Sequence, residues 1–74
     1  MIEGHLIKND IGRWEITTED GREFQLTSGS VCEVLVGKHW IRTSVESTNG
    51  SYYATTPGVL LMKGIPARTV EGSR

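Results

Sequence analysis

The chain has 74 residues and a mass of 8.2 kDa, which is enough for one domain and too little for two. Eight basic and nine acidic residues give a net charge of −1, which disfavours broad electrostatic capture of nucleic acid or of an anionic membrane. The longest apolar runs fall far short of the roughly 18 residues of a membrane span, and one cysteine can form neither an internal disulfide nor a zinc cage. We therefore expect a small domain without covalent staples in a reducing compartment, the cytoplasm by default.

Composition and turn spacing predict an all-β fold. Thr, Val and Ile supply 20 of the 74 residues, and these β-branched side chains favour strands over helices. The nine glycines recur through the chain, most of them beside Asp, Asn, Ser or Lys, which is typical of short strands joined by tight turns. The sequence predicts antiparallel strands at 4–8, 13–17, 23–26, 31–36, 39–46, 51–55 and 67–70.

Hairpin turns are indicated at 9–12, 19–21, 37–38 and 48–50, where Asn, Asp and Gly accept the positive φ that tight turns require. Pro57-Gly58 ends the sixth strand. The run Val-Leu-Leu-Met at 59–62 is too short for an α-helix, so we predict one 3₁₀ turn before the last strand. Residues 71–74 are predicted to be a frayed tail, which leaves residues 1–70 as a single domain.

Alternation along the predicted strands separates a dry face from a wet face. Trp14 and Ile16 point to the side opposite Arg13, Glu15 and Thr17. Two later strands alternate in the same way, with their apolar faces at Cys32, Val34, Val36, Ile41, Thr43 and Val45. Short, strongly twisted antiparallel strands that each have one apolar face close most economically into a small barrel.

The run GSVCEVLVGKHWIRTSVE at 29–46 has the pattern G-x-x-x-E-V-L-V-(G)-x-x-W-x-x-T-x-[IV]-E, and Tyr52-Tyr53, Leu61, Gly64 and Arg68 follow it. The elements G-x-L-x-x-N, W-E-I and D-G-R-x-F-x-L precede it, within residues 4–26. Together these resemble a family of small bacterial domains known as a domain of unknown function, in which a Trp-Tyr pair stands where this chain has Tyr52-Tyr53. The resemblance implies an SH3-like barrel of five to seven strands and a bacterial, phage or mobile-element origin. It implies no catalytic residue and no ligand.

Candidate catalytic groups have simpler structural interpretations. Cys32 lies in an apolar row, so we expect a packed small hydrophobe and not a nucleophile. His5 and His39 have no further ligands at metal-binding spacing, and the aspartates occur in turns. No glycine cluster follows a strand and opens a helix, as a phosphate-binding loop does. We therefore expect a protein that is not an enzyme, with no metal and no cofactor.

Aromatic and basic side chains supply the candidate binding residues. Small barrels often bind partners through rings in a groove between loops, and the groove predicted here consists of Trp40, Arg42, Tyr52 and Tyr53. The leading hypothesis is a protein-interaction or accessory module with an unidentified protein partner or a second copy of the chain. One alternative is a nucleic-acid adaptor, in which the same rings stack on bases and the cations are Arg13, Arg22, Lys38, Arg42 and Arg68. Another is a structural or inhibitory partner that occludes an enzyme through an edge strand.

Overall fold

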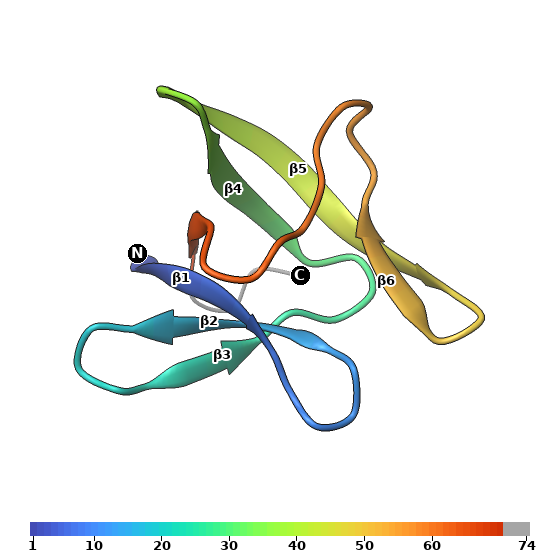
Figure 1. The fold of residues 1–74 in the computed structure, drawn as a ribbon, viewed down its shortest axis with the longest axis horizontal. Helices are drawn as coiled ribbons and strands as arrows, with labels where there is room; N and C mark the ends of the chain where they lie inside the picture. Colours follow the sequence, from blue (N-terminus) through green and yellow to red (C-terminus); the bar gives the residue numbers. More distant parts are fainter. Residues whose placement is uncertain (71–74) are drawn as a thin grey trace.

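A computed structural model describes residues 1–70 and contains a single antiparallel sheet of seven strands (Figure 1). The predicted strands are all present, with β1 starting two residues earlier and β5 ending two residues later than expected. The tail predicted for 71–74 lies outside the described residues. The strands are β1 (Ile2–Lys8), β2 (Trp14–Thr18), β3 (Glu23–Gln25), β4 (Val31–Val36), β5 (His39–Thr48), β6 (Ser51–Ala54) and β7 (Pro66–Thr69).

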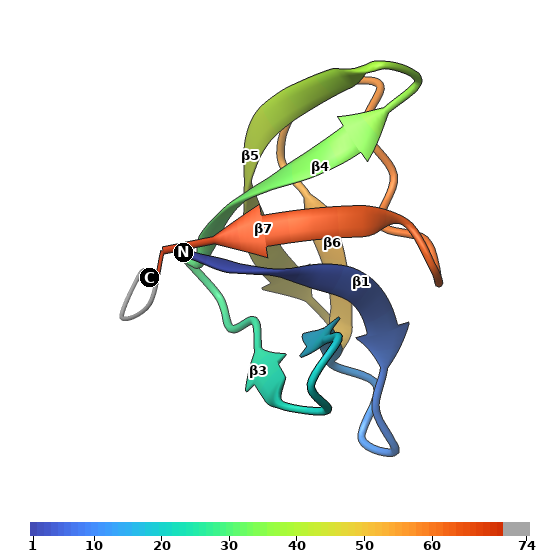
Figure 2. The same ribbon diagram turned by 90° about the vertical axis from the view of Figure 1, so that its left-hand side faces the viewer.

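The strand order is β3-β2-β1-β7-β4-β5-β6, so the last strand joins two three-stranded meanders. Figure 2 shows β7 lying between β1 and β4, with the two meanders curling away on either side. The sheet curls into a half-barrel, and β3 and β6 are its two edges. The all-β class and the barrel-like curvature predicted from the sequence are therefore confirmed.

The core fills the concave face of this half-barrel. One apolar side of each long strand supplies it, and Val59 closes it from the segment between β6 and β7. The alternation predicted for β2, β4 and β5 is confirmed, because Trp14, Cys32 and Val45 are buried while their sequence neighbours face outward. The buried set is Ile2, Leu6, Trp14, Ile16, Leu26, Cys32, Val34, Val45, Val59 and Ala67.

The predicted 3₁₀ turn at 59–62 is wrong. This segment contains no helical turn and is framed by two tight turns, in which Val59 N–H donates to the Thr56 carbonyl and Ile65 N–H to the Met62 carbonyl, each at 3.2 Å. Gly58 and Gly64 take φ values of 83° and 86° in these turns, which a glycine adopts without steric cost. Because the turns use the residues on both sides, 59–62 stays irregular and only Val59 becomes fully buried.

Two local features of the chain determine how closely, and in which register, neighbouring strands pair. A Cβ on Gly4 would lie 2.0 Å from the backbone oxygen of Thr17, so only glycine permits β1 and β2 to approach this closely. The two-residue turn Gly37-Lys38 sets Val36 opposite His39, and this register places Glu33 directly opposite Arg42.

Candidate functional site

Four charged residues form a row across the convex face of the sheet. Glu3 on β1 pairs in register with Arg68 on β7, Arg68 with Glu33 on β4, and Glu33 with Arg42 on β5. Acidic and basic side chains thus alternate over four neighbouring strands, an arrangement that favours cross-strand attraction. We call these four residues the charged row.

The centre of the charged row is a short ion pair. Arg68 Nε donates to Glu33 Oε1 at 2.6 Å, and the two side chains are 27% and 35% exposed. The guanidinium carbon of Arg68 also lies 4.0 Å from the ring centroid of Trp40, a cation–π distance. Arg68 is therefore held by an acid and a ring at once, and the half-buried Trp40 has one face covered by a cation.

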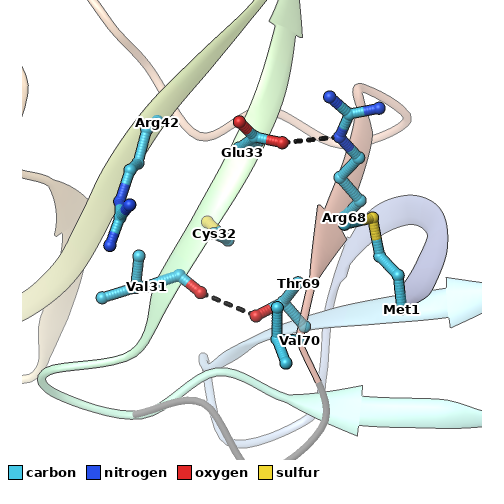
Figure 3. Close-up of a pocket in the computed structure, with 8 residues that line it drawn as sticks. All are labelled: Met1, Val31, Cys32, Glu33, Arg42, Arg68, Thr69 and Val70. Atoms are coloured by element: carbon cyan, nitrogen blue, oxygen red, sulfur yellow. Dashed lines mark hydrogen bonds and ion pairs between the residues drawn. The ribbon is translucent and has the colours of Figure 1, made fainter.

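Beside the charged row the surface is hollowed by about 460 Å³ (Figure 3). We call this the outer hollow. Figure 3 shows Arg42 along one wall, Met1 across from it, and the Glu33–Arg68 ion pair between the two strands that carry them. The remaining lining comes from Val31, Cys32, Thr69 and Val70.

Arg42 differs from Arg68 in its surroundings. Its side chain is exposed, and within residues 1–70 its guanidinium has no ion-pair or hydrogen-bond partner. Glu33 is directed to Arg68, so the charge of Arg42 is not compensated by its cross-strand neighbour. The exposed apolar side chains of Met1 and Val70 line the same hollow. The outer hollow therefore combines an open cation with apolar walls.

The structure does not gather the four residues of the predicted groove. Trp40 and Arg42 lie near the start of β5, whereas Tyr53 pairs with Glu46, six residues beyond Trp40 and about 20 Å away along the strand. Tyr53 is 45% exposed on the convex side. Tyr52 faces the concave side, packs against the core, and has the Arg13 guanidinium 5.7 Å from its ring centroid.

The remaining residues of the alternative basic patch are also dispersed. Arg22 pairs with Asp20 at 3.1 Å beside β3, and its guanidinium lies 5.5 Å from the Phe24 ring centroid. The hydrogen bond that Thr18 donates to Asp20, together with the Arg22 contact, holds the pKa of the Asp20 carboxyl below its usual value. Lys38 is exposed in the β4–β5 turn. Of the five cations, only Arg42 and Arg68 share a hollow.

Within residues 1–70, the side chains that could act as a nucleophile or as metal ligands lie apart from one another. Cys32 is buried as predicted, and burial, followed by the neighbouring charge of Glu33, raises the pKa of its thiol to about 11. Among residues 1–70, no three His, Cys, Asp or Glu side chains gather in a group that could hold a metal ion. The same part of the chain has no helix of the length and apolar content that a membrane crossing needs.

A second depression, of about 770 Å³, lies on the convex side of β1 and β2. Glu3, His5 and Glu19 line it, together with Thr17, whose hydroxyl is buried without a hydrogen-bond partner in the described part of the chain. No lysine or arginine lines this depression. It therefore contains carboxylates and no lysine or arginine, in contrast to the open cation of the outer hollow.

Comparison with known proteins identifies the family. The family model described as "Domain of unknown function (DUF5348)" matches residues 4–69. The chain belongs to this family. No curated protein and no solved structure matches the chain. The DUF5348 match begins within β1 and ends with β7, and it includes the residues of the outer hollow apart from Met1 and Val70.

Two features of the hollow were missed by sequence reasoning. The first is the cross-strand pair of Glu33 with Arg42, which could have been predicted because both residues lie equally far from the Gly37-Lys38 turn. Val31 and Val70 join the hollow only because β7 lies beside β4. No local pattern indicates that neighbour relation.

Proposed function

We propose that this DUF5348 chain is a non-enzymatic protein-interaction module that binds an extended acidic segment of a partner protein in the outer hollow. The observation that carries the proposal is the guanidinium of Arg42, uncompensated among residues 1–70, at a hollow of about 460 Å³ with apolar walls. A carboxylate can accept two hydrogen bonds from a guanidinium, and neighbouring apolar side chains of the same segment can cover Met1 and Val70.

The chemistry of the described residues favours binding over catalysis. A thiol with a pKa raised to about 11 is almost wholly neutral near pH 7, and a neutral thiol is a poor nucleophile. Cys32 is also buried, while the histidines at positions 5 and 39 are exposed on separate strands. These observations support a module without catalytic machinery.

Nucleic-acid binding is the second hypothesis, and the surface favours it less. Bases need open aromatic faces flanked by cations, yet one face of Trp40 is covered by Arg68 and Tyr52 packs against the core. Arg22 is paired with Asp20, and Lys38 lies at a turn away from the hollow. An acidic peptide needs only the one open cation and the hollow beside it.

The finer features implied by the family resemblance belong to the same proposal. We assign the half-barrel to the SH3-like type, which is supported by short antiparallel strands in which the first and last strands pair. A bacterial origin and a cytoplasmic location complete the proposal, the latter resting on a single, buried cysteine.

The test uses fluorescein-labelled ten-residue peptides in which Glu alternates with Leu, compared with peptides that carry Gln in place of Glu. Fluorescence anisotropy should show binding of the acidic peptide by the full chain, with an affinity about tenfold lower for Arg42→Ala. Arg22→Ala is the matched control, because Arg22 is exposed but lies outside the hollow.

Three outcomes would overturn this function. Equal binding of the Glu and Gln peptides would remove the role of the carboxylate. An equal effect of Arg22→Ala and Arg42→Ala would reduce the interaction to general charge attraction. Tighter binding of a labelled single-stranded oligonucleotide, falling steeply as salt rises, would establish the nucleic-acid hypothesis instead.

A further inference from the structure

The two edges of the sheet are built differently. β3 has three residues, and its exposed positions Glu23 and Gln25 follow the exposed Arg22, so charge interrupts this edge. β6 has four residues, Ser51–Ala54, and Thr55 and Thr56 follow it, so that residues 51–56 contain no charge and no proline. Short length and charge are the usual protection of a sheet edge against pairing with another chain. The β6 edge has no charge protection.

The turn between β5 and β6 determines which backbone groups of β6 are open. Asn49 and Gly50 form a two-residue turn with φ values of 53° and 81°, and Thr48 therefore faces Ser51 as the first hydrogen-bonded pair. Thr55 N–H donates to the Ser44 carbonyl at 2.9 Å, so the backbone of Thr55 also bonds toward β5. Ser51, Tyr53 and Thr55 thus bond toward β5, and the N–H and C=O groups of Tyr52 and Ala54 point away from it.

These four groups have no backbone partner within residues 1–70, because β6 is the last strand of the sheet and neither residue takes part in a bond outside it. We propose that the β6 edge pairs with the β6 edge of a second copy of this chain. In an antiparallel two-fold arrangement centred on Tyr53, Tyr52 of each copy faces Ala54 of the other. All four open groups of each copy are then satisfied by four hydrogen bonds.

The side chains suit this self-pairing. The two Tyr53 rings meet on the convex face at a non-hydrogen-bonded position, where Cβ atoms are about 4.5–5.5 Å apart and aromatic pairs are favourable. Tyr53 is 45% exposed in the single chain, so the contact covers a large apolar ring. On the concave face the bulky Tyr52 meets the small Ala54. No like charges oppose each other, since β6 contains none.

A second copy suits this edge because the open residues Tyr52 and Ala54 flank Tyr53, so two copies related by a two-fold axis at Tyr53 satisfy each other's open groups. If the two-fold axis moved by one residue, Tyr52 or Ala54 would face the same residue of the second copy. The open groups of the other residue would then have no partner on the β6 strand of that copy. Small domains also gain stability through association, since a chain of this length has a limited core. The pairing involves only short strands, so a concentration-dependent dimer is expected and not a permanent one.

Sedimentation or light scattering over a concentration series is the first test. The measured mass should rise from 8.2 kDa towards twice that value as concentration increases. Tyr53→Lys places two like charges opposite each other and should weaken association by about tenfold. Gln25→Lys introduces the same charge on the β3 edge and should leave association unchanged.

Cysteine cross-linking tests the register. Tyr53→Cys should form an intermolecular disulfide under mild oxidation, because residue 53 faces its own copy across the axis. Ser51→Cys is the matched control, since residue 51 faces Thr55 of the other copy; Cys32 stays buried in both variants. A chain that remains monomeric throughout, equal cross-linking of both variants, or sensitivity to Gln25→Lys in place of Tyr53→Lys would overturn the inference. Tyr53 lies outside the outer hollow, so this result is independent of peptide binding there.

Discussion

The two tryptophans of this chain lie on opposite faces of one sheet and in different environments. Trp14 on β2 is 8% exposed, belongs to the core, and has a single cation, Lys8, 5.7 Å from its ring centroid. Trp40 on β5 lies on the convex face, half-buried beneath the guanidinium of Arg68. The concave face is therefore ordered by apolar packing, and the convex face by charge and ring contacts. Substitutions on the two faces should differ in size and in salt dependence.

Trp14→Ala should produce the largest loss. Removing a buried indole from so small a core leaves a cavity, and the free energy of unfolding should fall by about 3–5 kcal/mol. Urea denaturation followed by circular dichroism measures this loss. Trp14→Phe is the control and should lose clearly less. A loss below about 1 kcal/mol for Trp14→Ala would contradict the division between the two faces.

Gly4→Ala tests the backbone on the concave side of β1, between Ile2 and Leu6. The added methyl would lie 2.0 Å from the Thr17 carbonyl oxygen, so β1 and β2 must separate locally, and we expect a loss of about 3 kcal/mol. Glu3→Ala, at the exposed neighbouring position, should change stability by less than about 0.5 kcal/mol. If urea denaturation gives equal losses for the two variants, the close approach of β1 to β2 is absent in solution.

The buried thiol of Cys32 makes the stability of the fold depend on pH. The pKa of Cys32 is raised from 9.0 to about 11, so the unfolded chain ionises first and stability falls as pH rises through this window. Relative to Cys32→Ala, the native chain should lose about 2 kcal/mol more between pH 8 and pH 11. Urea denaturation of both proteins at the two pH values measures the difference. Parallel pH profiles would show that the thiol is solvated in the folded state.

Much of the fold could be predicted because its signals are local. Asn9 illustrates this: its side-chain oxygen accepts hydrogen bonds from the N–H groups of Ile11 and Arg13, as expected for a turn asparagine. The position of β7 between β1 and β4 has no such signal, because it depends on pairings between opposite ends of the chain. The failed 3₁₀ turn has a related cause, since the fixed path from β6 to β7 and two glycine turns decided the conformation of 59–62.

The candidate site was harder to predict than the fold. Sequence reasoning selected Trp40 and Arg42 from their shared side of one strand, and the structure keeps them together. The predicted groove contains both Tyr52 and Tyr53 as aromatic rings, but adjacent residues of a strand point to opposite faces. Arg42 and Arg68 both belong to the predicted basic patch, and the structure places Glu33 between these two cations.

Trp40→Ala should have a smaller effect than Trp14→Ala and Gly4→Ala on the concave face. It removes a half-buried ring and one cation–π contact, so we expect a loss of about 1 kcal/mol. Glu33→Gln should cost about as much or less, because the ion pair with Arg68 is partly exposed and its contribution is reduced by solvent and salt.

The double substitution distinguishes a coupled cluster from independent contacts. Trp40 and Glu33 both hold the same guanidinium, so the loss in the double variant should differ from the sum of the single losses, and the difference should shrink in high salt. Additive losses would mean that ring and acid position Arg68 independently. A Trp40→Ala loss as large as that of Trp14→Ala would make the convex face part of the core. The outer hollow beside it would then be a packing defect and not a binding surface.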